Sequence, residues 1–560
     1  MKNITKSAGV SRRNFMGLAG ASVAAVALTG MLAGCGASGG KSGADVKSKS
    51  TVKLPTYKAF TGITPEFAGD GGALLDGYLN MPKPVPSTTE KPLKGTVTAM
   101  AANFGAPAPP KSDNPYWQKI SEAFGGNFEM QIVEEAGDGY DAKFATLLAA
   151  NDLPQITCVG FRNIPNLSAM LEAKFQDLTT HLSGDAVLDY PNLAALKTNT
   201  WQTVVVNDKI WGVPTTSTPL GQVMVGNSAA WEEVGGLNAK DADEFFEKAK
   251  AITNPKKKKY ALEATYINML HMFTEWYGAP NNWAVNEDRT LTHLYETDAY
   301  VAGLEYAAKL FKAGVFYPDS SLPSFDQMVI NGSVGAQVIA SPRGLDVHHR
   351  MDPNVKMEIL VPFGATSNLT PTYDLGNGVI GMAALQRNSD EKAIKEQLSL
   401  LNWLAAPFGT EEYLAKNYGF EGQDFNYDKN GNPIFTKEGA RNVPGVSTPF
   451  NSLTAAEPVN FISGAPEVTK YIQTQTEQLV KNAWRNPTLG LYSDSEAKLG
   501  PKLKKLVRDK TTDIITGRAS VSEHAEILKR WKAEGGDKMR AEYEAGLNPD
   551  TPVFKLQPIK

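Results

Sequence analysis

The chain has 560 residues, of which 42% are hydrophobic and 21% are charged, and its formal net charge is −4. This composition is that of an ordinary folded globular protein, and the length is more than one hydrophobic core usually holds, so two lobes or domains are expected. The acidic balance provides no basic patch, which argues against nucleic acid or an anionic membrane surface as a partner.

The beginning of the chain has the pattern of an export signal. An apolar stretch at 15–33, made mostly of small residues, follows the basic residues Lys2, Lys6, Arg12 and Arg13. This order is typical of a secretory signal, and Ser11-Arg12-Arg13-Asn14-Phe15-Met16 matches the twin-arginine export signal. A plain membrane-spanning anchor is the alternative, because the stretch approaches the roughly 20 residues that cross a bilayer. A stretch this rich in Gly and Ala inserts poorly, however, so we favour the signal.

The apolar stretch ends in Leu32-Ala33-Gly34-Cys35, which resembles the bacterial lipobox. The resemblance implies cleavage before Cys35 and a lipid on its thiol. Residues 1–34 are then the signal peptide, and the Gly- and Ser-rich residues 35–55 are a flexible tether. Cleavage removes four basic residues and no acidic one, which leaves a charge of −8. We expect a protein that a lipid anchors to the extracellular face of the cell membrane.

Cys158 is the only other thiol and lies in the apolar run Ile156-Thr157-Cys158-Val159. We expect it to be a buried strand residue, not a reactive thiol. With Cys35 lipidated, no disulfide can form within the chain, so the fold depends on its core.

Strands and helices alternate in the first part of the body. Residues 56–93, rich in Pro and Gly, predict a coil segment that wraps the body. Strands are predicted at 95–102, 128–133 and 154–159, and helices at 115–124 and 140–150. This spacing predicts a parallel α/β sheet with helices on both faces. Ligands bind at the carboxyl ends of such strands, where the loops 102–114 and 160–165 fall.

The second part of the body is richer in helices. Helical patterns cover 241–252, 298–313 and 390–405, and strand-like runs cover 334–340 and 379–385. The tail from 503 to 543 is almost wholly helical, with breaks at Thr516-Gly517 and Gly535-Gly536. The acid-and-amide run at 428–432 lacks the spacing of a calcium loop and predicts a hairpin turn.

Six motifs, in this order, resemble the extracellular solute-binding proteins of bacterial ABC importers, in particular the sugar-binding branch. They are Ala149-Ala150-Asn151-Asp152-Leu153-Pro154-Gln155-Ile156, Asn207-Asp208-Lys209-Ile210-Trp211-Gly212-Val213-Pro214, Trp231 to Leu237 with Asp243-Glu244-Phe245, Leu310 to Val315, Asn331 to Ala336, and Ile515-Thr516-Gly517-Arg518. The resemblance covers about residues 95–545. Longer relatives of the alginate type carry an acidic calcium loop near Asn254, but here the stretch is Asn254-Pro255-Lys256-Lys257-Lys258-Lys259. A hard cation is therefore not expected there.

The resemblance implies an α/β fold of two lobes, like a periplasmic binding protein of type II, the maltose-binding type, with hinge crossings and a ligand cleft. We place lobe 1 at 94–214 and 378–445, and lobe 2 at 215–377 and 446–560. The implied function is to capture a carbohydrate, expected to be an oligosaccharide, and to deliver it to the membrane permease subunits of an ABC importer. A monomer is expected.

A sugar site needs aromatic faces for stacking and planar polar groups for hydroxyls. The segment 266–283 is dense in both, and it supplies Tyr266, Trp276 and Trp283 as candidates. Tyr266 is proposed because the resemblance places a stacking tyrosine there. Trp283 is expected in a loop because Pro280, Asn281 and Asn282 precede it. The alternative for these aromatic residues is the core of the second lobe.

Other candidates follow predicted strands or crossings. Arg343 follows the strand at 334–340 and could donate a forked hydrogen bond to hydroxyls or a carboxylate; a surface ion pair is its alternative. The remaining candidates are Tyr373 and Asp374 before the second crossing, Tyr492 before a helix, and Asn103, Asp113 and Arg162 near strand ends of the first lobe.

The sequence contains no zinc-protease motif, no nucleotide-binding loop and no cluster of Cys and His, so no catalytic residue, metal site or cofactor is predicted. Two alternatives stay open. One is a binder of a non-sugar solute, such as a peptide, a lipid or an acidic metabolite. The other is a lipid-anchored glycosidase or polysaccharide lyase, because the paired carboxylates of such enzymes meet in space and not in sequence.

Overall fold

The computed structural model describes residues 52–135, 139–160, 164, 166–322, 324–388 and 390–559. The twin-arginine signal, Cys35 and Arg162 lie outside the described residues. The described residues belong to one compact unit that spans 47–560. None of the helices within these ranges combines the length and the apolar character that crossing a membrane requires.

A five-stranded sheet in the order β2-β1-β3-β14-β6 forms the centre of the first lobe. Its strands are β1 (Thr96–Asn103), β2 (Asn127–Glu134), β3 (Ile156–Gly160), β6 (Val213–Thr216) and β14 (Val379–Leu385). β1, β2 and β3 are parallel, as the alternating pattern predicted, with Thr96 opposite Asn127. β14 runs antiparallel to both β3 and β6, because it enters this sheet from the second lobe. Cys158 is buried in β3, as predicted.

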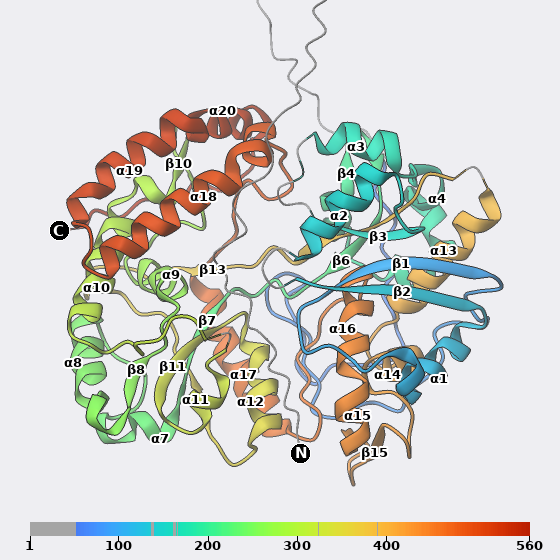
Figure 1. Cartoon of the computed structure of the whole chain (residues 1–560), viewed down its shortest axis with the longest axis horizontal. Coiled ribbons are helices and arrows are strands. Elements are labelled where there is room, and N and C mark those ends of the chain that lie inside the picture. Colours follow the sequence, from blue (N-terminus) through green and yellow to red (C-terminus); the bar gives the residue numbers. More distant parts are fainter. Residues whose placement is uncertain are drawn as a thin grey trace, which may run out of the picture. The chain divides into compact units, whose positions relative to one another are not determined.

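Helices cover this sheet on both faces (Figure 1). They are α1 (Pro115–Phe124), α2 (Gly139–Ala150), α3 (Leu167–Lys174), α4 (Thr179–Leu182), α5 (Pro191–Ala194), α6 (Thr198–Trp201), α13 (Glu391–Leu404), α14 (Glu411–Tyr418), α15 (Lys437–Asn442) and α16 (Pro444–Leu453). The side chain of Asn114 caps α1 by accepting from the backbone of Trp117, and Pro115 occupies the first turn, where no amide donor is needed. Two short hairpins complete the lobe, β4 (Val205–Val206) with β5 (Lys209–Ile210) and β15 (Phe425–Tyr427) with β16 (Pro433–Phe435). The second agrees with the turn predicted at 428–432.

The core of the first lobe corrects one predicted boundary. Phe124 packs edge-on against Trp403 at 4.9 Å and against Phe450 at 5.8 Å between ring centroids. Phe450 belongs to α16, and Val446 and Leu453 of the same helix are buried in this core. Residues 446–453, assigned to the second lobe from the sequence, thus pack in the first, because the apolar face of α16 lies against β1 and β14. The remaining lobe boundaries stay predictions.

The second lobe is built on a four-stranded sheet in the order β12-β7-β11-β8. Its strands are β7 (Val223–Asn227), β8 (Tyr260–Leu262), β11 (Val334–Ile339) and β12 (Met357–Ile359). β11 is parallel to β8 and antiparallel to β7. Two small ladders lie beside it, β9 (Trp283–Val285) with β10 (Leu291–His293) and β13 (Tyr373–Asp374) with β17 (Ala483–Trp484).

The helices of the second lobe are α7 (Ser228–Trp231), α8 (Ala242–Ile252), α9 (Tyr266–Trp276), α10 (Asp298–Lys312), α11 (Asp326–Ile330), α12 (Leu345–Met351), α17 (Pro466–Leu479), α18 (Asp494–Ile515), α19 (His524–Trp531) and α20 (Asp537–Gly546). The tail helices end or kink where the sequence predicted breaks. Gly517 has a φ of 74° after α18, and Gly535 has a φ of 156° before α20, both in a region that favours glycine.

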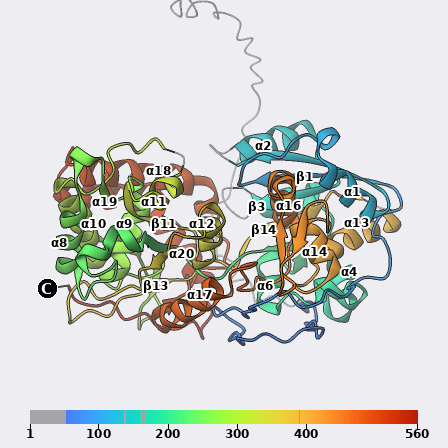
Figure 2. The same ribbon diagram turned by 90° about the horizontal axis from the view of Figure 1, so that it is seen from below.

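The segment from 52 to 93 has neither a helix nor a laddered strand and runs over the surface of the unit, in blue in Figure 2. Its backbone bonds to the first lobe through Lys58 and Ala194, and to the segment before α17 through Tyr78 and Asn460. Leu75 is buried in a core that also contains Leu220, Tyr373 and residues of α17. The chain passes between the lobes in two segments, one after β6 and one before β14, which we call the first and second crossings. The segment from 52 to 93 therefore packs against both the first lobe and the residues next to these crossings.

Candidate functional site

A cavity of about 840 Å³ lies where the chain passes between the two lobes. Its lining comes from the first lobe at Lys197–Thr203, from both crossings at Ser217 and Asn377, and from the second lobe at Trp283 and 484–491. The volume falls within the range of roughly 300–1,000 Å³ that is usual for small-molecule sites.

The position of the cavity follows from the two sheets. β6 ends at Thr216, which pairs with Val379 at the start of the antiparallel β14. Val223, the first residue of β7, pairs with Ile339, the last residue of β11. The crossings after β6 and before β14 therefore lie at the carboxyl edge of the first sheet, and the residues before β7 lie at that of the second. This is the edge at which open α/β sheets bind ligands.

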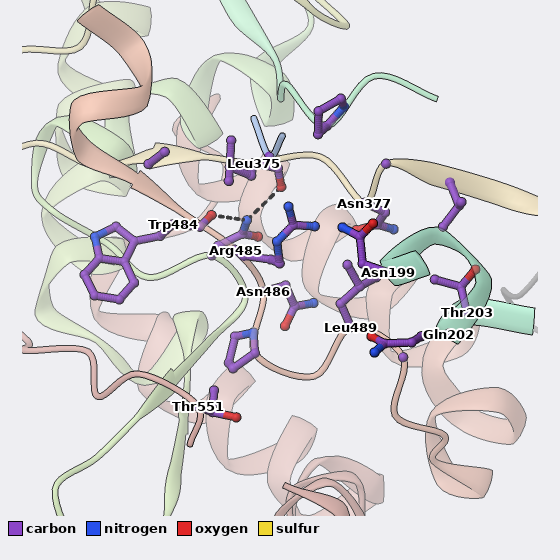
Figure 3. Close-up of a pocket in the computed structure, with 18 of the residues that line it drawn as sticks. Asn199, Gln202, Thr203, Leu375, Asn377, Trp484, Arg485, Asn486, Leu489 and Thr551 are labelled. Carbon is purple, nitrogen blue, oxygen red and sulfur yellow. Dashed lines mark hydrogen bonds between the residues drawn. The ribbon is translucent and has the colours of Figure 1, made fainter. Parts of the chain in front are cut away.

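Polar side chains project into the cavity from several segments (Figure 3). Asn199, Gln202 and Thr203 come from α6 and the turn after it, Asn377 comes from the second crossing, and Asn486 follows β17. Each amide offers a donor and an acceptor side by side, which is the arrangement that neighbouring sugar hydroxyls require.

A buried amide holds two parts of this wall together. The side chain of Asn281 donates to the carbonyl oxygens of Leu375 and Trp484, each at 2.9 Å (Figure 3). The backbone N–H of Leu375 also donates to the carbonyl oxygen of Trp484 at 2.9 Å. The second crossing and the segment after α17 are therefore fixed to each other on one side of the cavity.

Arg485 supplies a positive charge to the cavity. Figure 3 shows its side chain between Trp484 on one side and Asn199 and Asn377 on the other. The side chain is exposed to solvent, but the protein around it removes part of its hydration, which lowers the pKa of the guanidinium. Within the described part of the chain, no carboxylate lies close enough to pair with it. This fork of donors is thus available to a ligand.

Trp276 and Trp283, two of the predicted stacking residues, are core residues. Trp276 is fully buried in α9, with its ring 4.4 Å from that of Phe363 and 5.0 Å from that of Phe245. It cannot offer a face to a ligand, and we remove it from the site. Trp283 was predicted to lie in a loop, and this prediction is wrong, because Trp283 is the first residue of β9. It is 4% exposed, because it packs against His293, Trp531 and Tyr543, and it is also one of the residues that line the cavity.

The predicted residues of the second crossing are buried as well. The hydroxyl of Tyr373 donates to the carbonyl oxygen of Gly221 at 3.0 Å, which ties the two crossings together. Asp374 is buried beside His271. Tyr266, at the start of α9, packs edge-on against Phe311 and Phe316 and does not line the cavity. These residues support the site and do not form its surface.

Tyr492 and Arg343 extend between the lobes away from the cavity lining. Tyr492 is 43% exposed, and its phenol bonds with the backbone of Leu167 in the first lobe. Arg343 is partly buried near Tyr413 and Tyr418 of α14, and we find no ion pair for it among the described residues. Tyr492 directly follows Leu491, a lining residue, and stays a candidate at the rim.

The two described candidates of the first lobe have other roles. The amide of Asn103 is buried and donates to Gly105 and to Glu134, each at 2.9 Å, so it shapes the loop after β1. Asp113 is exposed in a short helical turn and does not line the cavity.

The lining residues that we did not predict include Asn199, Asn377, Trp484, Arg485 and Asn486. The run Trp484-Arg485-Asn486-Pro487 combines an aromatic ring, a cation, an amide and a turn residue, and this signal was visible in the sequence. The sequence around Asn199 and Asn377 is of ordinary polar composition, so no local sequence pattern identifies them as lining residues.

The chain is similar in sequence and in structure to known binding proteins. The chain is 24% identical over 439 residues to the polygalacturonan/rhamnogalacturonan-binding protein YtcQ of Bacillus subtilis, with 75% of this chain and 85% of that protein covered. An HMO-binding solute-binding protein from Bifidobacterium longum infantis has a TM-score of 0.60 at 14% identity, over 81% of this chain and 99% of its own. The N-glycan transport protein NgtS of Streptococcus pneumoniae has a TM-score of 0.58 at 15% identity, over 81% of this chain and 99% of its own.

These two structures share the two-lobe α/β fold described above. Residues 116–420, which are more than half of the chain, match a family described as bacterial extracellular solute-binding protein. The chain belongs to the family of bacterial extracellular solute-binding proteins.

Proposed function

We propose that this protein captures an oligosaccharide in the cavity between its lobes and delivers it to the permease subunits of an ABC importer. The observation that carries the proposal is the make-up of the cavity, which is lined by amides from both lobes and the crossing together with Trp484 and Arg485. Amides can bond neighbouring hydroxyls, and an aromatic ring stacks on the apolar face of a sugar. The relative named in the sequence comparison, a polygalacturonan/rhamnogalacturonan-binding protein, supports a carbohydrate ligand.

Arg485 favours a sugar that carries a carboxylate. It has no carboxylate partner in the described residues, although Glu457 and Asp550 line the same cavity together with Lys197. A uronate would provide the planar anion that a guanidinium binds with two parallel hydrogen bonds. We therefore propose an oligosaccharide that contains uronic acid as the ligand.

The test is calorimetric titration with oligogalacturonates and with neutral oligosaccharides of equal length. We expect binding of the acidic series and much weaker binding of the neutral one. Arg485→Gln should weaken binding of the acidic series by about 1.5–3 kcal/mol, which is roughly tenfold to 150-fold, because it removes a charge-assisted hydrogen bond.

Arg441→Gln is the matched control, because Arg441 is exposed on α15, where it pairs with Glu438 outside the cavity. This variant should bind as the parent does. Equal affinity for both series, unchanged by Arg485→Gln, would remove the uronate proposal. Binding of a peptide, lipid or acidic metabolite with no carbohydrate binding would overturn the sugar proposal itself.

We also propose that the protein binds without turnover. An oligosaccharide incubated with the protein should be recovered chemically unchanged by mass spectrometry. Shorter or unsaturated products at catalytic ratios would instead support the glycosidase or lyase alternative.

The lipid anchor at Cys35, on the extracellular face of the cell membrane, and the twin-arginine route are part of the same proposal. Cys35→Ser should move the protein from the membrane fraction to the soluble fraction, because the thioether-linked lipid would be its anchor after cleavage. Replacing Arg12 and Arg13 with Lys should block export. A Cys35→Ser variant that stays with the membranes would contradict the anchor.

A further inference from the structure

Three ionisable side chains meet behind the cavity wall. His271 and Glu275 lie one turn apart on α9, and Asp374 lies on β13 at the second crossing. The Nε2 atom of His271 is 3.5 Å from Oδ2 of Asp374 and 4.0 Å from Oε1 of Glu275. One donor atom from each of the three lies within 4.8 Å of the other two.

The two carboxyl groups of this cluster lack the partners that burial requires. Glu275 is 1% exposed and Asp374 is 6% exposed. Oε1 of Glu275 accepts from the backbone N–H of Asp374 at 2.8 Å, but Oε2 of Glu275 and Oδ1 of Asp374 have no hydrogen-bond partner in the described part of the chain. Two buried carboxylates are costly unless a proton or a cation compensates them.

No Lys or Arg of the described residues supplies that compensation. Burial raises the pKa of both carboxyls, and for Glu275 the nearby Asp374 raises it further. Burial lowers the pKa of His271 to about 4, so its imidazole is neutral at pH 7 and can donate a lone pair. The cluster thus contains a neutral imidazole and two carboxyl groups that gain from a nearby positive charge.

We propose that His271, Glu275 and Asp374 form a binding site for a divalent transition-metal ion of the Zn²⁺ type. One nitrogen and two carboxylate oxygens are ligands that Zn²⁺ accepts, whereas Ca²⁺ prefers six to eight oxygens. Metal–ligand bonds of about 2.0–2.1 Å in tetrahedral geometry place neighbouring ligand atoms about 3.3 Å apart. The donor atoms, which lie 3.5 and 4.0 Å from Nε2 of His271 and all within 4.8 Å of one another, would therefore have to approach by up to about 1.5 Å.

The site has room for a fourth ligand and a defined place in the fold. The side chain of His271 is 29% exposed, which leaves a path by which water can reach the ion. A bound ion would join α9 to the second crossing at Asp374. The next residue, Leu375, lines the cavity and accepts the amide of Asn281. The metal would thus hold in place the wall that faces the ligand.

The experiment titrates Zn²⁺ into the full chain after treatment with EDTA and its removal, with calorimetry and melting temperature as readouts. We expect one equivalent of Zn²⁺ to bind and to raise the melting temperature, while Ca²⁺ at millimolar concentration has no effect. His271→Gln, Glu275→Gln and Asp374→Asn should each weaken Zn²⁺ binding at least tenfold. His181→Gln is the matched control, because His181 lies in the first lobe with Glu391 as its ion-pair partner at 3.7 Å, and this variant should bind Zn²⁺ as the parent does.

Two measurements on the unsubstituted chain keep the proposal testable if a variant fails to fold. X-ray absorption at the zinc edge should show imidazole and oxygen ligands without sulfur. Titrations in buffers of different ionisation enthalpy should show that Zn²⁺ displaces protons, because a metal ion binds the deprotonated form of its ligands. Absence of Zn²⁺ binding, binding that survives Glu275→Gln and Asp374→Asn, or a spectrum without imidazole would each overturn the proposal.

Discussion

The aromatic segment at 266–283 and the segment at 484–491 both contain tryptophan, but the first fills a core and the second lines the cavity. In the first, Trp276 and its neighbours fill the core of the second lobe. In the second, Trp484 is partly exposed and stands beside Arg485 and Asn486 on the cavity. A dense run of aromatic residues on a helix therefore marked a core. A single aromatic residue among polar and turn residues marked the ligand surface, since a ligand face must stay open to water before binding.

Trp276→Ala is expected to give the largest effect of this comparison. It should lower the free energy of unfolding by about 3–5 kcal/mol, because it leaves a cavity among Phe245, Phe273 and Phe363. Urea denaturation of the ligand-free protein measures the loss. The folded fraction should bind ligand normally. A variant with parental stability and lost binding would return Trp276 to the site.

Trp283→Ala should affect both properties, because Trp283 packs in the core and also lines the cavity. We expect the unfolding free energy to fall by about 2–4 kcal/mol, somewhat less than for Trp276, with a weaker affinity of the folded protein. Melting curves with and without ligand separate the two effects. Unchanged stability with a large loss of affinity would restore the loop platform that the sequence suggested.

Trp484→Ala should show the opposite balance. Its ring contacts Phe554 edge-on at 4.6 Å but is partly exposed, so ligand-free stability should change by less than about 1 kcal/mol. Sugar affinity should fall by about 1–3 kcal/mol through the loss of a stacking face. Calorimetry on Trp484→Ala and Trp276→Ala in parallel sharpens the contrast, and equal affinities for Trp484→Ala and the parent would exclude stacking.

A pH dependence is also expected at Glu275 and Asp374, and it is small over any single pH unit. Their pKa values are raised in the folded protein, so the folded state holds more protons than the unfolded state above the ordinary carboxyl range. Without metal, stability should therefore decrease as pH rises from about 4 towards neutrality, by at most about 1.4 kcal/mol per pH unit for each carboxyl. Glu275→Gln and Asp374→Asn should each flatten this slope in denaturation curves at pH 5 and pH 7.5. Parallel slopes for parent and variants would show that these carboxyls titrate normally.

The local elements and the family were readable from the sequence alone. Hydrophobic periodicity, the cap at Asn114 and the glycines at 517 and 535 act over a few residues. They predicted strands β1, β2, β3, β11 and β14, helices α1, α2, α8, α10 and α13, and the breaks in the tail. The order of short motifs between 95 and 545 indicated the solute-binding family. The assignment of α16 was wrong, because which sheet receives an apolar helix face depends on the path of the chain and not on the helix itself.

The tertiary structure alone decided the sites. The cavity joins α6, the crossing at 375–379 and the segment at 484–491, which are more than a hundred residues apart in the sequence, and no local pattern connects them. His271 and Glu275 stand four residues apart, a spacing that places both on one helix face. Asp374 reaches them because the backbone N–H groups of Thr372 and Asp374 donate to Glu275. The sequence determines which segments are helix, strand or core. Long-range packing determines which polar side chains meet, because the free energy that brings them together comes from apolar burial elsewhere.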